Sequence, residues 1–311
     1  MKTLSGIFPA LLTPFDASGR INEDSLRKLV SFNIAKGVDG FYVCGSTGEA
    51  FLLSHEERKR ILEVVVSEVA GRVAVICHVG AISTDFSIEL GRHAVVTGAD
   101  AVSSIPPFYY KFSTDEVLGF YRDLADAIEL PVIPYNFPAL SGVSLSGDLI
   151  RQLRKHPRIA GVKFTSSDLF QLERMKKADP ELIVYNGFDE MFLAGMAMGA
   201  DGAIGSTYNF MPGKFLGIRE RLLAGDLPGA RALQDQANEV IQVLIATGKP
   251  LVAQKYLTGL IGLPCGDCRR PFIPLTNTEK ANLDAVAERC LDLPESGKQV
   301  ASKFGKQEKG K

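Results

Sequence analysis

The sequence predicts an α/β fold, a (β/α)8 barrel of the TIM type followed by a C-terminal extension of three helices. Eight short apolar runs rich in Val and Ile alternate with longer helical patterns in the first two thirds of the 311 residues. The runs largely lack polar/apolar alternation, which is typical of strands buried on both faces of a parallel sheet. A doubly wound sheet is the alternative, but its GxGxxG motif after the first strand is absent.

The expected strands are evenly distributed between residues 7 and 206. In order they are Ile7–Thr13, Gly40–Cys44, Val73–Val79, Ala101–Ile105, Val132–Asn136, Gly161–Phe164, Leu182–Asn186 and Gly202–Ser206.

Local signals mark where the intervening helices begin and end. Ser54-His-Glu-Glu57 and Ser113-Thr-Asp-Glu116 are capping boxes, in which the hydroxyl and the carboxylate satisfy free backbone N–H groups. Gly37, Gly98 and Gly199 each precede an expected strand by a few residues. Glycine favours the left-handed backbone that ends a helix, so these positions predict helix C-termini.

Beyond Met211 the pattern is purely helical, with helices expected at Asp226–Thr247, Pro250–Gly259 and Thr276–Leu291. We expect residues 1–210 to hold the barrel strands and most barrel helices. Residues 211–293 should hold the last barrel helix and an extension suited to an oligomer contact or a lid. Residues 294–311 contain five lysines and few apolar side chains, which predicts a disordered basic tail.

Net charge, the length of apolar runs and the number of cysteines argue against several classes of protein. A net charge of -1 and a pI near 6.5 give no basic surface for nucleic acid. No apolar run approaches the ~20 residues that span a bilayer, and the apolar N-terminus is interrupted by Pro9. Five cysteines, an odd number, favour reduced thiols in a cytoplasmic protein. Neither Cys265-Gly-Asp-Cys268 nor the histidines complete a metal-ligand pattern.

Lys163 is the strongest candidate for a catalytic residue, because it lies in the apolar stretch Ala160-Gly-Val-Lys-Phe164. Lysines are rarely buried unless paired or functional, and burial favours the neutral amine that attacks carbonyls. Tyr135, one strand earlier, is suited to moving protons beside that amine. The alternatives are a strand-end lysine that reaches solvent or a carboxylate, and an ordinary core tyrosine.

Two further clusters follow expected strands, where active sites of such barrels lie. Gly45-Ser46-Thr47-Gly48 has the glycines and hydroxyls of an anion-binding turn that fits a carboxylate, although it could be an ordinary loop. Glu49 is interpreted as an acid at a helix entry. Asp189 and Glu190 could accept hydrogen bonds from a polyol or merely complement a helix dipole.

These motifs together resemble the dihydrodipicolinate synthase/N-acetylneuraminate lyase family. The resemblance rests on Gly45-Ser-Thr-Gly-Glu49, Tyr135-Asn-x-Pro138, Lys163 and the Gly-Ala-Asp-Gly-x-Ile-Gly-Ser stretch that ends at Ser206. It extends from about Leu4 to Leu291. Its implications are a barrel with three C-terminal helices, a homotetramer, and class I aldolase chemistry on pyruvate without a metal or organic cofactor.

Within the family, several stretches are similar to the lyases rather than the synthases, which carry an arginine just after the proline of Tyr135-Asn-Phe-Pro138. By resemblance, Lys163 would form the imine and Tyr135 would transfer protons during cleavage of a sialic acid to pyruvate and an amino sugar. The residues expected to bind substrate are Ser46 and Thr47 for the carboxylate and Thr165, Gly187, Asp189, Glu190 and Ser206 for the sugar. Tyr109 would reach the neighbouring subunit's site.

Three other functions stay open at this point. One is a family aldolase for a 2-keto-3-deoxy sugar acid, or a dihydrodipicolinate synthase. Another is a non-catalytic barrel that binds a keto acid, which would need no reactive amine. A third is a metal-dependent aldolase.

Overall fold

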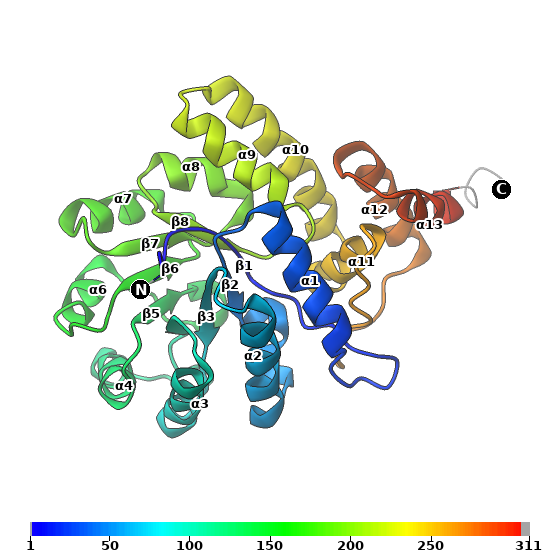
Figure 1. Cartoon of the computed structure of the whole chain (residues 1–311). Helices are drawn as coiled ribbons and strands as arrows, with labels where there is room; N and C mark the ends of the chain where they lie inside the picture. Colours follow the sequence, from blue (N-terminus) through cyan, green and yellow to red (C-terminus); the bar gives the residue numbers. More distant parts are fainter. Residues whose placement is uncertain (1, 306–311) are drawn as a thin grey trace.

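The computed structural model describes residues 2–305, and its centre is a barrel of eight parallel strands (Figure 1). The strands are β1 Gly6–Pro9, β2 Gly40–Val43, β3 Ala74–His78, β4 Ala101–Ser104, β5 Val132–Asn136, β6 Gly161–Phe164, β7 Ile183–Asn186 and β8 Gly202–Gly205. Their order is β1-β8-β7-β6-β5-β4-β3-β2. A parallel bridge between Ala10 and Tyr42 joins β1 to β2 and closes the ring, which confirms the predicted barrel.

Helices surround the strands on the outside (Figure 1). Those of the barrel are α1 Glu23–Lys36, α2 His55–Val69, α3 Thr84–Thr97, α4 Thr114–Ala127, α5 Pro138–Ser141, α6 Gly147–Leu153, α7 Leu169–Ala178, α8 Phe192–Ala197 and α9 Pro212–Leu223. Both predicted capping boxes are present at Ser54 and Ser113. Gly37 and Gly98 end α1 and α3 in the left-handed conformation, as predicted.

The inside of the barrel is filled by side chains, so the ring is a packed core with no channel. The interior cluster contains Phe8, Ala10, Tyr42, Ala74, Ile76, Ala101, Ile105, Ile133, Tyr135, Tyr185 and Ile204. Two larger apolar clusters lie between the strands and the helices. Tyr135 therefore belongs to the interior layer, and the loops after the strands lie directly above it.

The largest difference from the predicted strands is at β1, which ends at Pro9 instead of Thr13. The backbone N–H of Leu12 donates to the side chain of Asn209 (3.1 Å) instead of to a neighbouring strand. An apolar run therefore continues beyond the sheet, because its hydrogen bonds are satisfied by a side chain.

The C-terminal extension contains α10 Leu227–Ala246, α11 Pro250–Leu260 and α12 Asn277–Cys290, close to the predicted helices. Figure 1 shows α11 to α13 gathered on one side of the barrel. The limits that we drew at residues 210 and 293 remain a prediction. Among residues 2–305, no helix has the length and apolar character needed to cross a membrane.

The prediction of a disordered tail from residue 294 is wrong as far as residue 305, because α13 spans Glu295–Gly305. Its buried face carries small residues, with Gly297 and Ala301 one helical turn apart. A Cβ at Gly297 would lie 2.0 Å from the carbonyl oxygen of Leu260, so glycine permits a close approach to the end of α11. Residues 306–311 of the predicted tail lie outside the described residues.

Candidate active site

A pocket of about 470 Å³ lies at the C-terminal ends of the strands. Every candidate site residue except Tyr109 lines it: Ser46, Thr47, Tyr135, Lys163, Thr165, Gly187, Asp189, Glu190 and Ser206. The structure thus brings together residues that the sequence places in the loops after β2 and β7, on β5 and β6, and after β6 and β8.

Lys163 and Tyr135 are paired across neighbouring strands, in register between β6 and β5. The Lys163 Nζ atom lies 4.0 Å from the centre of the Tyr135 ring and 4.4 Å from that of Tyr42. Lys163 is 5% exposed. Burial lowers its pKa to about 7, against the opposing negative charge of Asp189. A substantial fraction of the amine is therefore neutral, and nucleophilic, near physiological pH.

Tyr135 is also buried, and burial raises the pKa of its phenol above the usual value. The hydroxyls of Thr165 and Ser46 act in the opposite direction. The phenol therefore stays protonated at neutral pH while lying beside two hydroxyl groups and the amine. A group in this state is able to pass a proton between a substrate and its neighbours.

The turn Gly45–Gly48 leaves the backbone N–H groups of Ser46 and Thr47 without acceptors among the described residues. Its geometry is fixed from both sides, because Cys44 and Glu49 each adopt a left-handed backbone with φ of 59°. The Gly48 carbonyl accepts a hydrogen bond from Thr13 Oγ1 (2.8 Å). Free N–H groups next to hydroxyls are suited to an anion such as a carboxylate, so Gly45–Gly48 remains a predicted carboxylate-binding turn.

The loops after β7 and β8 meet around Asp189, which is 6% exposed. Its Oδ2 accepts hydrogen bonds from the backbone N–H and the hydroxyl of Thr207 (both 2.8 Å) and a longer one from Ser206 Oγ (3.4 Å). Burial raises the Asp189 pKa to about 6, although the bonds from Thr207 oppose the shift. The Asp189 Oδ2 atom thus joins the loop after β7 to the loop after β8.

Gly187 lies against Thr165, since a Cβ there would be 1.9 Å from Thr165 Oγ1. The close approach requires glycine and keeps both residues on the pocket wall. Glu190 lines the pocket beside them, and Asn238 of α10 donates to its carbonyl oxygen (3.2 Å). Hydroxyl, carboxylate and backbone groups therefore line the same pocket as the turn Gly45–Gly48.

The C-terminal extension supplies a wall that sequence reasoning missed. Its members are Ile241, Leu244, Ile245, Pro250, Leu251, Gln254 and Phe272. The segments after the strands add Ala10, Phe137, Leu140, Phe188 and Thr207, and β8 adds Ile204. Apolar residues of the extension resemble core residues in the sequence. The expectation that the extension could act as a lid was the only indication that these residues line the pocket.

Glu49 and Tyr109 are the two predicted positions that lie outside the pocket lining. Glu49 does precede a short 3-10 helix, Ala50–Leu52, as expected, but its side chain does not cap that helix. Glu49 adopts a left-handed conformation, and its carboxylate is buried against Lys255 (2.6 Å). Tyr109 does not line the pocket; it is 84% exposed and contacts Tyr110. Its predicted role in a neighbouring subunit's site stays a prediction. Within residues 2–305 no cluster of three or more His, Cys, Asp or Glu side chains forms a metal site.

A buried amine of low pKa, a phenol beside it and a carboxylate-binding turn at a barrel mouth define a class I aldolase, a carbon–carbon lyase that works through an imine. The model of the Dihydrodipicolinate synthetase family matches residues 3–290. The chain belongs to this family.

Individual relatives match over nearly the whole chain. An N-acetylneuraminate lyase of Rhizobium meliloti is 50% identical over 92% of this chain and 94% of its own length. A Clostridium difficile protein solved in complex with mannosamine has a TM-score of 0.90 and 36% identity, over 93% of this chain and 100% of its own. A catalytic-lysine mutant of the Ruminococcus gnavus sialic acid aldolase has a TM-score of 0.89 and 32% identity, over 98% and 100%.

Proposed function

We propose that the chain is an N-acetylneuraminate lyase that reversibly cleaves sialic acid to N-acetylmannosamine and pyruvate. The observation that carries this proposal is the buried Lys163 amine, which has no ion-pair partner among residues 2–305 and shares its pocket with the Ser46–Thr47 turn and with several hydroxyl and carboxylate groups. The similarity to the Rhizobium meliloti N-acetylneuraminate lyase and the Ruminococcus gnavus sialic acid aldolase supports it.

The reaction begins with the open-chain keto form, whose carboxylate binds to Ser46 and Thr47. Lys163 attacks the C2 carbonyl, and loss of water gives a cationic imine. Removal of the proton from the C4 hydroxyl, with Tyr135 as the relay, breaks the C3–C4 bond, and its electron pair moves into the imine. N-acetylmannosamine leaves, a proton adds to the enamine carbon, and water releases pyruvate and the free amine.

Two features favour a hydroxyl-rich substrate over the semialdehyde used by the synthases of the family. The residue after Pro138 is Ala139, so an arginine for a second carboxylate is lacking at this position. Thr165, Glu190 and Ser206 line the pocket and supply polar groups suited to the hydroxyls of a departing sugar. In the proposed mechanism the imine accepts the electron pair, so the residues described here suffice without a metal.

The test is pyruvate release from a panel of N-acetylneuraminate, 2-keto-3-deoxygluconate and related acids, each with and without a chelator. We expect N-acetylneuraminate to give the highest kcat/KM, unchanged by the chelator. A higher value for 2-keto-3-deoxygluconate would reassign the substrate. Loss of activity in chelator would favour a metal-dependent aldolase, and binding without turnover would favour a keto-acid-binding barrel.

We further propose that the enzyme is a cytoplasmic homotetramer in which Tyr109 approaches a neighbouring active site. The five thiols are free, which suits a reducing compartment. Tyr109 is strongly exposed and has a left-handed backbone with φ of 79°, a strained state that a partner surface would stabilise. Light scattering should give a tetramer, and Tyr109→Ala should lower activity; a fully active monomer would contradict both.

A further inference from the structure

Glu49 directs its carboxylate away from the pocket and into the C-terminal extension, although it directly follows the carboxylate-binding turn. Glu49 Oε1 lies 2.6 Å from Lys255 Nζ, and the side chains are 0% and 2% exposed. Glu49 Oε2 accepts a hydrogen bond from the backbone N–H of Arg269 (2.8 Å). The turn is thus connected to residues more than 200 positions later in the chain.

The Lys255 side chain contacts groups from the extension and from the segment that follows β1. Its Nζ donates to the carbonyl oxygen of Asp267 (3.1 Å) and lies 4.2 Å from the centre of the Phe15 ring. The ammonium is therefore enclosed by a carboxylate, a carbonyl and an aromatic face. Lys255 belongs to α11, and two other residues of that helix, Leu251 and Gln254, line the active-site pocket.

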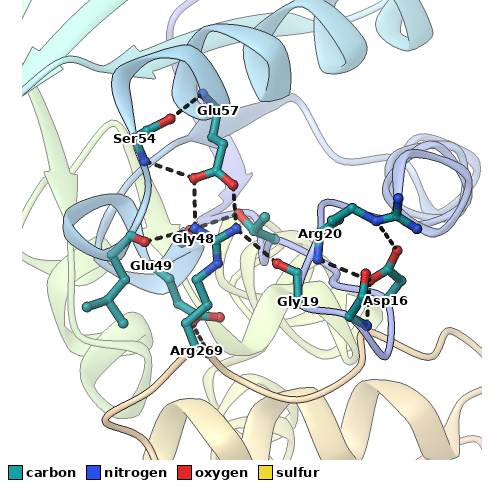
Figure 2. A network of polar contacts seen from close by, with 11 residues as sticks. Asp16, Gly19, Arg20, Gly48, Glu49, Ser54, Glu57 and Arg269 are labelled. Atoms are coloured by element: carbon teal, nitrogen blue, oxygen red, sulfur yellow. Dashed lines mark hydrogen bonds and ion pairs between the residues drawn. The ribbon is translucent and has the colours of Figure 1, made fainter.

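Arg269 also joins the C-terminal extension to the barrel (Figure 2). Its guanidinium donates to both carboxylate oxygens of Glu57 at the start of α2. It also donates to the carbonyl oxygens of Leu52 (2.9 Å) and Gly19 (3.0 Å). Arg269, whose backbone N–H donates to Glu49, is therefore also bound to Glu57, Leu52 and Gly19 at the mouth of the barrel.

The backbone of Glu49 shows why an anchor is needed. A non-glycine residue with φ of 59° is strained, and such a conformation persists only where surrounding contacts enforce it. Glu49 N donates to the Ser46 carbonyl, so a change in its backbone would alter the direction of the free N–H groups of Ser46 and Thr47.

We propose that Glu49 is a positioning residue that, through its buried ion pair with Lys255 and its bond from Arg269, orients the Ser46–Thr47 turn for the pyruvate carboxylate. This inference rests on the proposed function. It assigns to the C-terminal extension a role in recognition of the keto acid, in addition to the pocket wall that the extension supplies.

The experiment compares Glu49→Gln, Lys255→Met and the double variant Glu49→Met/Lys255→Met. Each single change leaves one buried charge without its partner and should lower Tm, whereas the double variant removes both charges and should recover most of it. The second measurement is the pyruvate concentration that half-saturates borohydride trapping of Lys163. We expect all three variants to raise it about 10- to 100-fold, because misplaced binding groups cost that much.

The double variant separates positioning from a purely structural role. If the pair only stabilises the fold, the double variant should recover both Tm and pyruvate affinity, and that result would overturn the inference. The matched control is Lys176→Met, which breaks the ion pair with Asp201 (2.8 Å) just before β8, at the other end of the barrel. It should lower Tm without changing the half-saturating pyruvate concentration.

The same assay distinguishes the inference from the proposed function. A wild-type protein that pyruvate and borohydride do not modify at Lys163 would contradict the function itself. A wild-type protein that is modified, with an unchanged half-saturating concentration in all three variants, would overturn only the role of Glu49.

Discussion

Two regions of this molecule are each built around a buried lysine, and their chemistry differs. Lys163 in the barrel and Lys255 in the extension are 5% and 3% exposed. Each ammonium lies over an aromatic ring, 4.0 Å from Tyr135 and 4.2 Å from Phe15. Lys255, however, has the Glu49 carboxylate at 2.6 Å, whereas Lys163 forms no ion pair with any residue in the described range 2–305.

The difference teaches that burial alone does not make an amine reactive. A buried charge without a partner is costly, and Lys255 has such a partner in the Glu49 carboxylate. Lys163 has only the more distant charge of Asp189, and its pKa falls to about 7. In this molecule the lysine proposed to react is the one without a contacting carboxylate among residues 2–305, and the paired lysine joins the extension to the barrel.

Replacement of the unpaired lysine should have the largest effect. Lys163→Ala should lower kcat by on the order of 10⁴-fold or more, because no nucleophile remains to form the imine. Pyruvate and borohydride should label Lys163 in the wild-type protein, as seen by peptide mass spectrometry. A stable adduct on Lys255 instead, or a fully active Lys163→Ala protein, would invalidate the comparison.

Removal of the phenol that lies over the reactive amine should come next. Tyr135→Phe should slow turnover by about 10²- to 10⁴-fold, the usual contribution of a proton-transfer group, while the fold is retained. Steady-state kinetics and circular dichroism would measure the two effects. A wild-type rate would exclude Tyr135 from proton transfer.

The paired lysine should affect stability as well as the binding of pyruvate. Lys255→Met leaves Glu49 buried without a cation, which should cost about 3–5 kcal/mol of unfolding free energy. Denaturant titration would measure it, with Lys176→Met as the partly exposed control, whose ion pair should contribute less. Equal losses in the two variants would show that burial of the Glu49 pair has no special consequence.

The smallest effect is a gradual dependence on pH. Imine formation needs the neutral amine, and the Lys163 pKa is lowered to about 7. The rate of borohydride trapping at low pyruvate concentration should therefore be nearly constant well above pH 7 and fall about tenfold per unit well below it. A midpoint near the usual lysine value of 10.5 would show that Lys163 is as solvated as a surface lysine.

Much of the catalytic end of the pocket was predictable from the sequence. Lys163 and Tyr135 lie in apolar strands, and strand ends of a barrel converge on one mouth, so their proximity followed from the fold. Hydroxyls and glycines at Ser46 and Thr47 indicated an anion site. The roles of these residues remain predictions, while their common position is a feature of the structure.

The role of Glu49 was misread for a physical reason. An acid after a glycine-rich turn resembles the first residue of a helix, because the sequence shows only its local neighbours. Its actual partners, Lys255 and Arg269, are more than 200 residues away. The helix α13 was missed for a related reason, since a composition of lysines and small residues does not reveal that Gly297 packs against Leu260.

The sequence by itself determined the alternation of strands and helices, their caps and the burial of Lys163, because these depend on local periodicity and on the chemistry of single residues. Only the tertiary structure decided which buried charge has a partner, which helix forms the far wall of the pocket and what holds the carboxylate-binding turn. Those outcomes depend on contacts between distant segments, and a linear pattern of polar and apolar residues does not specify which segments meet.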